Sequence, residues 1–132
     1  MSTNLDIFNQ YNNSLIAGDF DGVFATMADD IIWHQPGHHV LSGTIVGKKD
    51  LSPHLGGFAA KTNGSFKVIT NWVSENQDLV AANVTFVGTR ADGKELDMNG
   101  IDLFRIEDGK IKEVWLFSSF QDIEDEFWNG AS

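Results

Sequence analysis

Four long stretches of alternating apolar and polar residues fill the second half of the chain, and they constrain its fold more than any other feature. They cover residues 65–75, 79–90, 95–107 and 110–120, and short turn sequences such as Asp108-Gly109 separate them. A period of two is typical of strands, and turns this short join antiparallel neighbours. This half of the chain therefore predicts a meander of four antiparallel strands.

The first half of the chain has mainly helical periodicity. Residues 4–18 place Phe8, Tyr11 and Leu15 on one face of a predicted helix. Further helices are expected over residues 20–27, 47–61 and 122–128, the last with Ile123 and Phe127 on its buried side, and a strand over residues 28–36. Helices followed by a meander predict an α+β fold in which helices cover one face of the sheet.

Length and composition predict a single domain over residues 1–132 and narrow the class of function. A net charge of -10, with only 9 Lys and Arg residues, disfavours binding to nucleic acid or to an anionic membrane surface. The chain has no cysteine, which excludes thiolate chemistry. No signal sequence or long apolar run is present, so we expect a cytoplasmic protein.

The strand predicted over residues 95–107 carries apolar residues on both faces. One face holds Met98, Gly100, Asp102, Phe104 and Ile106. Ile101 and Leu103 lie on the opposite face, which the helices cannot also cover. A second copy of the chain is the simplest cover, so we expect a homodimer.

Asp102 is the unusual member of this strand, because alternation directs its carboxyl group toward apolar neighbours. An unpaired carboxylate in such a place costs several kcal/mol or takes up a proton. Tyr11, the only tyrosine, is also expected to face inward. Two interpretations stay open. Tyr11 and Asp102 are either hydrogen-bonded core groups or two proton donors aimed into a cavity, as an oxyanion hole requires.

Two segments of the chain resemble the steroid delta-isomerases, also called ketosteroid isomerases. "QYNNSLIAGDFDGVFATMADDIIWHQPG" is similar to their opening, and "NGIDLFRIEDGKIKEVWLF" is similar to their penultimate hairpin. The wider group is the nuclear transport factor 2-like superfamily, which includes the SnoaL-like polyketide cyclases. "WHQPG", "SGTIVGK" and the ending "DEFW" look most like SnoaL-like members.

The resemblance implies a cone-shaped fold, in which a curved antiparallel sheet wraps around three N-terminal helices and encloses an apolar pocket. In the isomerases a tyrosine and a protonated aspartate stabilise the oxygen of a dienolate. Tyr11 and Asp102 match those two positions. The third catalytic position, an aspartate that moves the proton, is Gln35 here. An amide cannot act as a general base near neutral pH, so the steroid reaction by this route is not expected.

A histidine is the natural replacement for the missing base. Strict alternation along the strand puts Trp33 and Gln35 inward and His34 outward, whereas a bulge beside Pro36 would turn His34 into the pocket. We include His34 among the candidate catalytic residues on the second alternative. His38 is expected at the mouth of the pocket or in solvent. The candidate substrate-binding residues are Trp33, Gln35, His39, His54, Phe58, Met98 and Phe104.

The sequence therefore supports two functional hypotheses. One is an enzyme that needs no cofactor or metal and acts on a small apolar carbonyl compound by proton transfer, as an isomerase, cyclase or dehydratase. Its catalytic residues would be Tyr11, Asp102 and a histidine. The other is a non-catalytic module that binds a small apolar ligand. Gln35 favours the second hypothesis, whereas the presence of Tyr11 and Asp102 favours the first.

Overall fold

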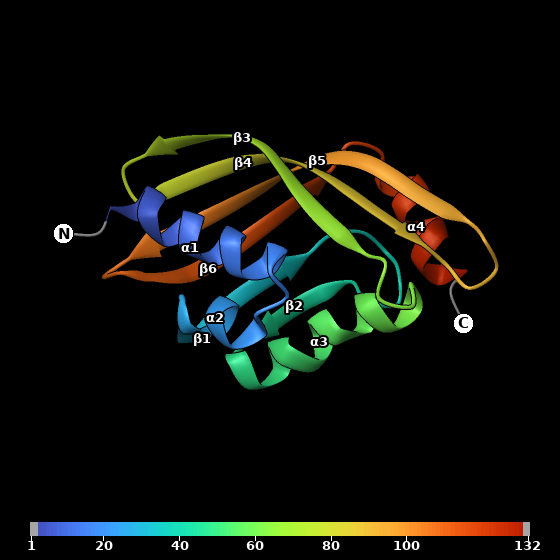
Figure 1. The fold of residues 1–132 in the computed structure, drawn as a ribbon, viewed down its shortest axis with the longest axis horizontal. Helices are drawn as coiled ribbons and strands as arrows, with labels where there is room; N and C mark the ends of the chain where they lie inside the picture. Colours follow the sequence, from blue (N-terminus) through green and yellow to red (C-terminus); the bar gives the residue numbers. More distant parts are fainter. Residues whose placement is uncertain (1–2, 131–132) are drawn as a thin grey trace.

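The computed structural model describes residues 3–130, which form four helices and one six-stranded sheet (Figure 1). In chain order these elements are α1 (Asn4–Ile16), α2 (Phe20–Ala25), β1 (Met27–Gln35), β2 (Gly43–Val46), α3 (Lys48–Lys61), β3 (Lys67–Asn76), β4 (Leu79–Thr89), β5 (Glu95–Glu107), β6 (Lys110–Ser118) and α4 (Gln121–Asn129). The domain predicted over residues 1–132 includes residues 1, 2, 131 and 132, which lie outside the described range.

All six strands belong to one curved sheet with the order β2-β1-β6-β5-β4-β3. Strands β3 to β6 form the predicted antiparallel meander. β1 departs from the predicted antiparallel sheet, because it pairs with β6 in parallel. A parallel neighbour is possible here because most of the chain lies between the two strands. β2 was not predicted, since its four residues give too little periodicity to recognise a strand.

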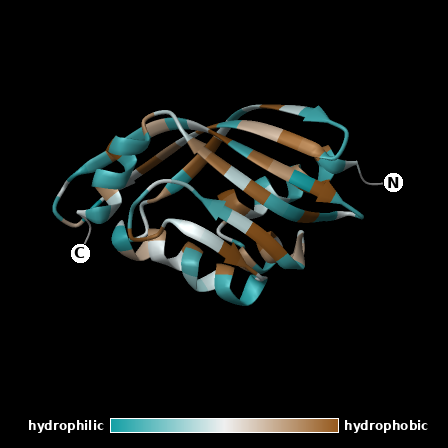
Figure 2. Cartoon of the chain, turned by 180° about the vertical axis from the view of Figure 1, so that it is seen from behind, coloured by the Kyte–Doolittle hydropathy of each residue, from teal (hydrophilic) through white to brown (hydrophobic). Residues whose placement is uncertain are grey.

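Helices α1, α2 and α3 lie against the concave side of the sheet, which we call the inner face (Figure 1). Alternation is regular along β4, whose residues Val80, Ala82, Val84 and Phe86 are buried. The apolar core therefore lies between the helices and the strands. The hydropathy colouring shows hydrophobic residues interspersed with hydrophilic ones along the strands (Figure 2). The predicted α+β fold with a curved sheet wrapped around helices is confirmed, with the sheet left open rather than closed into a barrel.

Local signals explain where α1 begins. Thr3 accepts a hydrogen bond from the backbone N–H of Asp6, and the Asp6 carboxylate accepts one from the backbone N–H of Thr3. This reciprocal capping box satisfies two backbone donors that the first helical turn would otherwise leave unpaired. The cap fixes the helical phase that directs Phe8 and Tyr11 toward the sheet. None of the described helices is long and apolar enough to cross a membrane.

The C-terminal helix α4 exists as predicted but presents a different face. Phe127 is buried, whereas Ile123 is 55% exposed, so the prediction that both face inward is wrong. The buried side instead holds Glu124, Phe127 and Trp128. Burying Trp128 removes more apolar surface from water than burying Ile123 would, which accounts for this rotation of the helix.

Candidate active site

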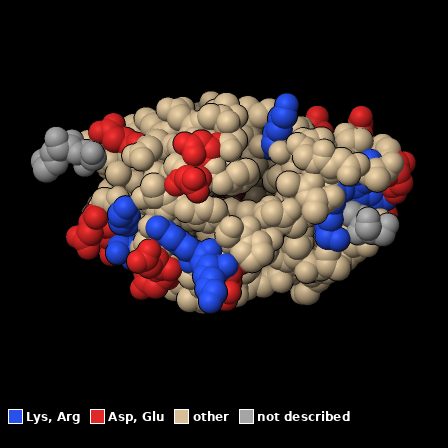
Figure 3. All heavy atoms as spheres, turned by 60° about the horizontal axis from the view of Figure 1, so that its bottom comes forward, with Lys and Arg blue, Asp and Glu red and all other residues tan. Residues whose placement is uncertain are grey.

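A cavity of about 600 Å³ lies between the helices and the inner face of the sheet. Its wall is mostly apolar, with Leu55 and Phe58 from α3 and Val84 and Phe86 from β4 among its lining residues. The space-filling view shows a hollow among uncharged atoms near the middle of one face, with acidic side chains to one side of it (Figure 3). The polar residues that line this cavity include Tyr11, Gln35, Lys67, Asp102, Ser118 and Glu124.

Tyr11 reaches the cavity from the buried side of α1. Its ring packs edge-on against Phe104, with ring centres 5.2 Å apart, and lies 6.1 Å from Phe8. These contacts hold the ring in one place and leave the hydroxyl group at the cavity wall. Burial, followed by the nearby negative charge of Asp102, raises the pKa of the Tyr11 hydroxyl above its usual range. Tyr11 is therefore a proton donor that stays neutral in the physiological range.

Asp102 faces the same cavity from the middle of β5. The register between β4 and β5 runs without a shift, so alternation holds and the carboxyl group points to the inner face, as predicted. Burial, followed by the negative charge of Glu124, raises the pKa of Asp102 to about 7. Asp102 is half-buried and lines the cavity wall. Near neutral pH a large share of Asp102 is thus protonated and able to donate a hydrogen bond.

Glu124 is the cavity residue that the sequence did not reveal. It is only 5% exposed. Its Oε2 accepts a hydrogen bond of 3.1 Å from Nε1 of Trp128, and its Oε1 accepts one of 2.9 Å from Nε2 of Gln121. Burial raises the pKa of Glu124, while hydrogen bonds from Trp128, Gln121 and Ser118 oppose the rise. Glu124 lies four residues before Trp128, so the two residues share one face of the helix. Three other acidic residues lie in the same segment, so this spacing did not single out Glu124 in the sequence.

Gln35 lines the cavity as a fixed hydrogen-bond acceptor. Its Oε1 accepts hydrogen bonds from Nε1 of Trp33 at 3.0 Å and from Nε2 of His54 at 3.1 Å. The amide oxygen has no proton to give, so Nε2 of His54 must carry the hydrogen. Burial lowers the pKa of His54, which keeps the ring neutral. His54 does not line the cavity, so it is not placed to contact a ligand directly, although the sequence predicted such a contact. It lies behind Gln35 and supports that side chain.

His39 also lies behind the cavity wall. Its Nδ1 accepts a hydrogen bond from the backbone N–H of Leu41, and its Nε2 is buried without a partner among the described residues. The ring centre lies 6.4 Å from that of Trp128. Burial is the main influence that lowers the pKa of His39. His39 does not line the cavity, because Trp128 and Leu41 occupy the space around its ring. His38 is exposed in the neighbouring loop.

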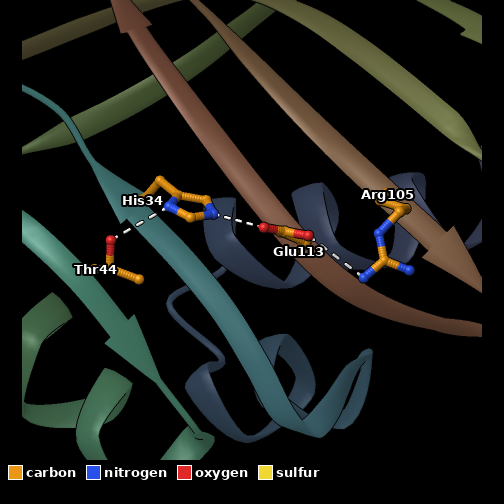
Figure 4. A network of polar contacts seen from close by, with 4 residues as sticks. All are labelled: His34, Thr44, Arg105 and Glu113. Atoms are coloured by element: carbon orange, nitrogen blue, oxygen red, sulfur yellow. Dashed lines mark hydrogen bonds and ion pairs between the residues drawn. The ribbon is translucent and has the colours of Figure 1, made fainter.

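His34 points to the opposite, outer face of the sheet, so its predicted place in the pocket is wrong. Its Nε2 lies 2.6 Å from Oε2 of Glu113, which also pairs with Arg105 at 3.5 Å, and its Nδ1 lies 3.4 Å from the Thr44 hydroxyl (Figure 4). We call these four residues the outer network. No bulge interrupts the pairing of β1 with β2 from Ile32 to Gln35, so strict alternation holds. None of the four histidines, all within the described range, lines the cavity.

The remaining predicted contacts divide into two groups. Trp33 and Phe58 line the cavity, as expected for substrate-binding residues. Met98 and Phe104 face inward, as alternation predicts, but do not line it. Phe104 packs against the ring of Tyr11. The sulfur of Met98 accepts a hydrogen bond of 2.7 Å from the Ser118 hydroxyl. Within residues 3–130, no group of three or more His, Asp or Glu side chains is arranged to hold a metal ion.

Comparison with known proteins identifies the family. The model of the SnoaL-like domain matches residues 8–114, and no curated protein matches the chain. A structure from Xanthomonas campestris, a protein of unknown function with a cystatin-like fold, is 39% identical with a TM-score of 0.91, covering 96% of this chain and 98% of its own.

Two more distant structures share the fold alone. An NTF2-like protein of unknown function from Burkholderia pseudomallei is 16% identical with a TM-score of 0.87, covering 98% of this chain and 100% of its own. TerC, co-crystallized with polyporic acid, is 18% identical with a TM-score of 0.83. The match covers 96% of this chain and 98% of TerC. The predicted superfamily is therefore confirmed. By its match over most of its length, the chain belongs to the SnoaL-like domain family.

Proposed function

We propose that this protein is a cofactor-free enzyme that transfers a proton within a small, apolar, carbonyl-bearing molecule, as an isomerase, cyclase or dehydratase. The observation that carries the proposal is that Tyr11 and Asp102, whose pKa values burial raises, lie on the wall of one apolar cavity. A carbonyl oxygen held between them would gain two hydrogen bonds as it becomes an enolate oxygen. Donors placed where charge develops stabilise the transition state more than the ground state.

The cavity suits a molecule of this class. Its volume of about 600 Å³ falls within the range of ligand pockets, and apolar side chains dominate its wall. TerC, which shares the fold, has been co-crystallized with polyporic acid, which supports the use of this fold to hold a small molecule. A shared fold does not assign a reaction, so the reaction type is inferred from the two donors Tyr11 and Asp102.

A non-catalytic binding module is the second candidate. The observation that favours it is Gln35, whose amide oxygen is already held by Trp33 and His54 and cannot accept a proton as a base. In that case Tyr11 and Asp102 would only orient the ligand. The two candidates differ in whether bound ketones exchange hydrogen with solvent.

The test uses cyclohex-3-enone, a small β,γ-unsaturated ketone, in D₂O. The wild type is expected to accelerate both exchange of its acidic hydrogens and conversion to the conjugated ketone. Removing one such donor typically costs about 10²–10³-fold in rate, so Tyr11→Phe and Asp102→Asn should each show a large loss. Asp97→Asn, an exposed change on the opposite face of the same strand, is the matched control. Acceleration that survives both donor substitutions would contradict the proposal, and binding without acceleration would favour the binding module.

We also propose that the chain forms a homodimer through the outer face of the sheet. Trp72 is 55% exposed there, and Ile101 and Leu103 are only partly covered. Joining two such faces would remove this apolar surface from water. Sedimentation at micromolar concentration is expected to give the mass of two chains, and a monomer would contradict it.

Cytoplasmic localisation stays a prediction from the sequence.

A further inference from the structure

The proposed reaction lacks a proton acceptor. The histidines lie outside the cavity, and Gln35 cannot serve. We propose that Glu124 is the general base of this site, taking a proton from the carbon next to the substrate carbonyl and returning it to a more distant carbon. The inference rests on the proposed function, because a base is needed only if a proton moves.

The location of Glu124 suits a base. Glu124 lines the same cavity as Tyr11 and Asp102, although it comes from the last helix of the chain. It is 5% exposed, so its carboxyl group is removed from bulk water and directed to the interior. Carboxyl groups are costly to bury, and one held at a cavity wall is a candidate for a functional role.

The two carboxyl groups of the cavity have different hydrogen-bond partners. Among the described residues, Asp102 has no hydrogen-bond donor to stabilise its charged form, whereas Glu124 has Trp128 and Gln121. Burial raises the pKa of both groups, but only Glu124 has hydrogen-bond donors that favour its carboxylate form. The negative charge of Glu124 adds to burial in raising the pKa of Asp102. Environments that separate two nearby acids in this way assign one as donor and the other as acceptor.

Glu124 can also accept a further hydrogen bond. An ionised carboxylate offers about four lone-pair directions, of which Trp128, Gln121 and Ser118 use up to three. A lone pair is therefore available for a substrate hydrogen. These donors also fix the rotation of the carboxylate, so that little orientational freedom is lost when it acts.

The proton and electrons balance without a further reactant. Glu124 takes the proton from the carbon between the carbonyl group and the alkene, and the C–H electron pair forms the new double bond of a dienolate. The carbonyl π pair moves onto the oxygen, which Tyr11 and Asp102 stabilise by donating hydrogen bonds. Protonated Glu124 then gives the proton to the far carbon of the dienolate, the carbonyl group re-forms, and the carboxylate is restored.

The experiment compares Glu124→Gln with Glu126→Gln, an exposed change on the same helix. The first removes the base but keeps an oxygen that can accept from Trp128. It should lower the rate of cyclohex-3-enone isomerisation by about 10²–10⁴-fold, the usual contribution of a general base. Its affinity for β-naphthol, a phenol that needs only the donors Tyr11 and Asp102, should change little. Glu126→Gln should leave both unchanged.

A rescue experiment separates a catalytic role from a structural one. Glu124→Ala leaves space for a small carboxylate, so added acetate should restore part of the isomerisation rate while added chloride should not. If Glu124→Gln binds β-naphthol and retains the wild-type rate, Glu124 is not the base and the proposed function stands. If the wild type does not isomerise the ketone although it binds it, the proposed function fails and the base role fails with it.

Discussion

Asp102 and Glu113 lie on neighbouring strands of one sheet but face opposite sides of it, and their surroundings differ in every respect. Asp102 borders an apolar cavity, has no ionic partner in the described chain, and has its pKa raised to about 7 by burial. Glu113 faces outward, where His34 and Arg105 share its two oxygens (Figure 4). The same chemical group is therefore a proton donor on one face and part of an ion-pair network on the other.

The comparison shows that the side of the sheet, and not the residue type, decides the chemistry. His34 and Arg105 contact the two carboxylate oxygens of Glu113 on the outer face. Asp102 has no such contact among the described residues, and burial raises its pKa, because an unpaired carboxylate is costly in an apolar environment. Three predictions test this difference, beginning with the largest expected effect.

The largest effect concerns the pH dependence of stability. Asp102 has a pKa of about 7 in the folded protein against 3.8 for an ordinary aspartate, so between these values the folded state holds a proton that the unfolded chain releases. The free energy of unfolding should fall as pH rises from about 4 to about 7, by up to about 4 kcal/mol. Asp102→Asn should remove this loss and be more stable than wild type above pH 7.

Urea denaturation at about pH 5 and about pH 8 measures the effect. The difference between wild type and Asp102→Asn should grow with pH, whereas Glu113→Gln should show no comparable growth. Comparing variants is necessary because burial shifts the pKa values of Glu124, His39 and His54 as well. A constant difference between wild type and Asp102→Asn would show that Asp102 is ionised in the folded protein.

An intermediate effect concerns ligand binding. β-Naphthol places a phenolic oxygen where an enolate oxygen would lie, so it should accept hydrogen bonds from Tyr11 and Asp102. Asp102→Ala is expected to weaken binding by roughly 1–3 kcal/mol, the cost of losing one buried hydrogen bond. Calorimetric titration gives the affinity, and Glu113→Ala should match wild type. Equal affinity for all three proteins would assign Asp102 a structural role only.

The smallest effect concerns the outer network. His34 and Glu113 are 33% and 19% exposed at their side chains, so water weakens their attraction. A double-mutant cycle with His34→Ala and Glu113→Ala should give a coupling energy below about 1 kcal/mol. Isomerisation by His34→Ala should equal that of wild type. A rate loss in this variant would restore His34 as a candidate base and weaken the contrast between the two faces.

Periodicity was sufficient to predict most of this contrast. Alternation along β5 placed Asp102 inward, and alternation along β1 placed Trp33 and Gln35 inward with His34 outward. The error at His34 came from allowing a bulge that the pairing of β1 with β2 does not contain. Alternation states a side chain's direction but not its depth, so Met98 and Phe104 were expected at the cavity although they pack beside it.

The residues that periodicity missed depend on contacts between distant segments. Glu124 lies in a short helix with several acidic residues, and only packing of Trp128 against Phe58 and Phe66 determines which of them turns inward. His39 and His54 were expected in the pocket because the sequence places histidines near pocket residues. Their positions behind the wall follow from hydrogen bonds to Leu41 and Gln35, which no local pattern specifies.

The parallel pairing of β1 with β6 also has a consequence for the order in which the molecule can form. His34 and Glu113 are 79 residues apart in the chain, whereas the strands from β3 to β6 each pair with a sequence neighbour. Closing the longer loop is slower, so we expect the meander to form first and β1 to join afterwards. Tyr11 from α1 and Glu124 from α4 both line the cavity, so during synthesis the cavity is complete only after residue 124 has left the ribosome.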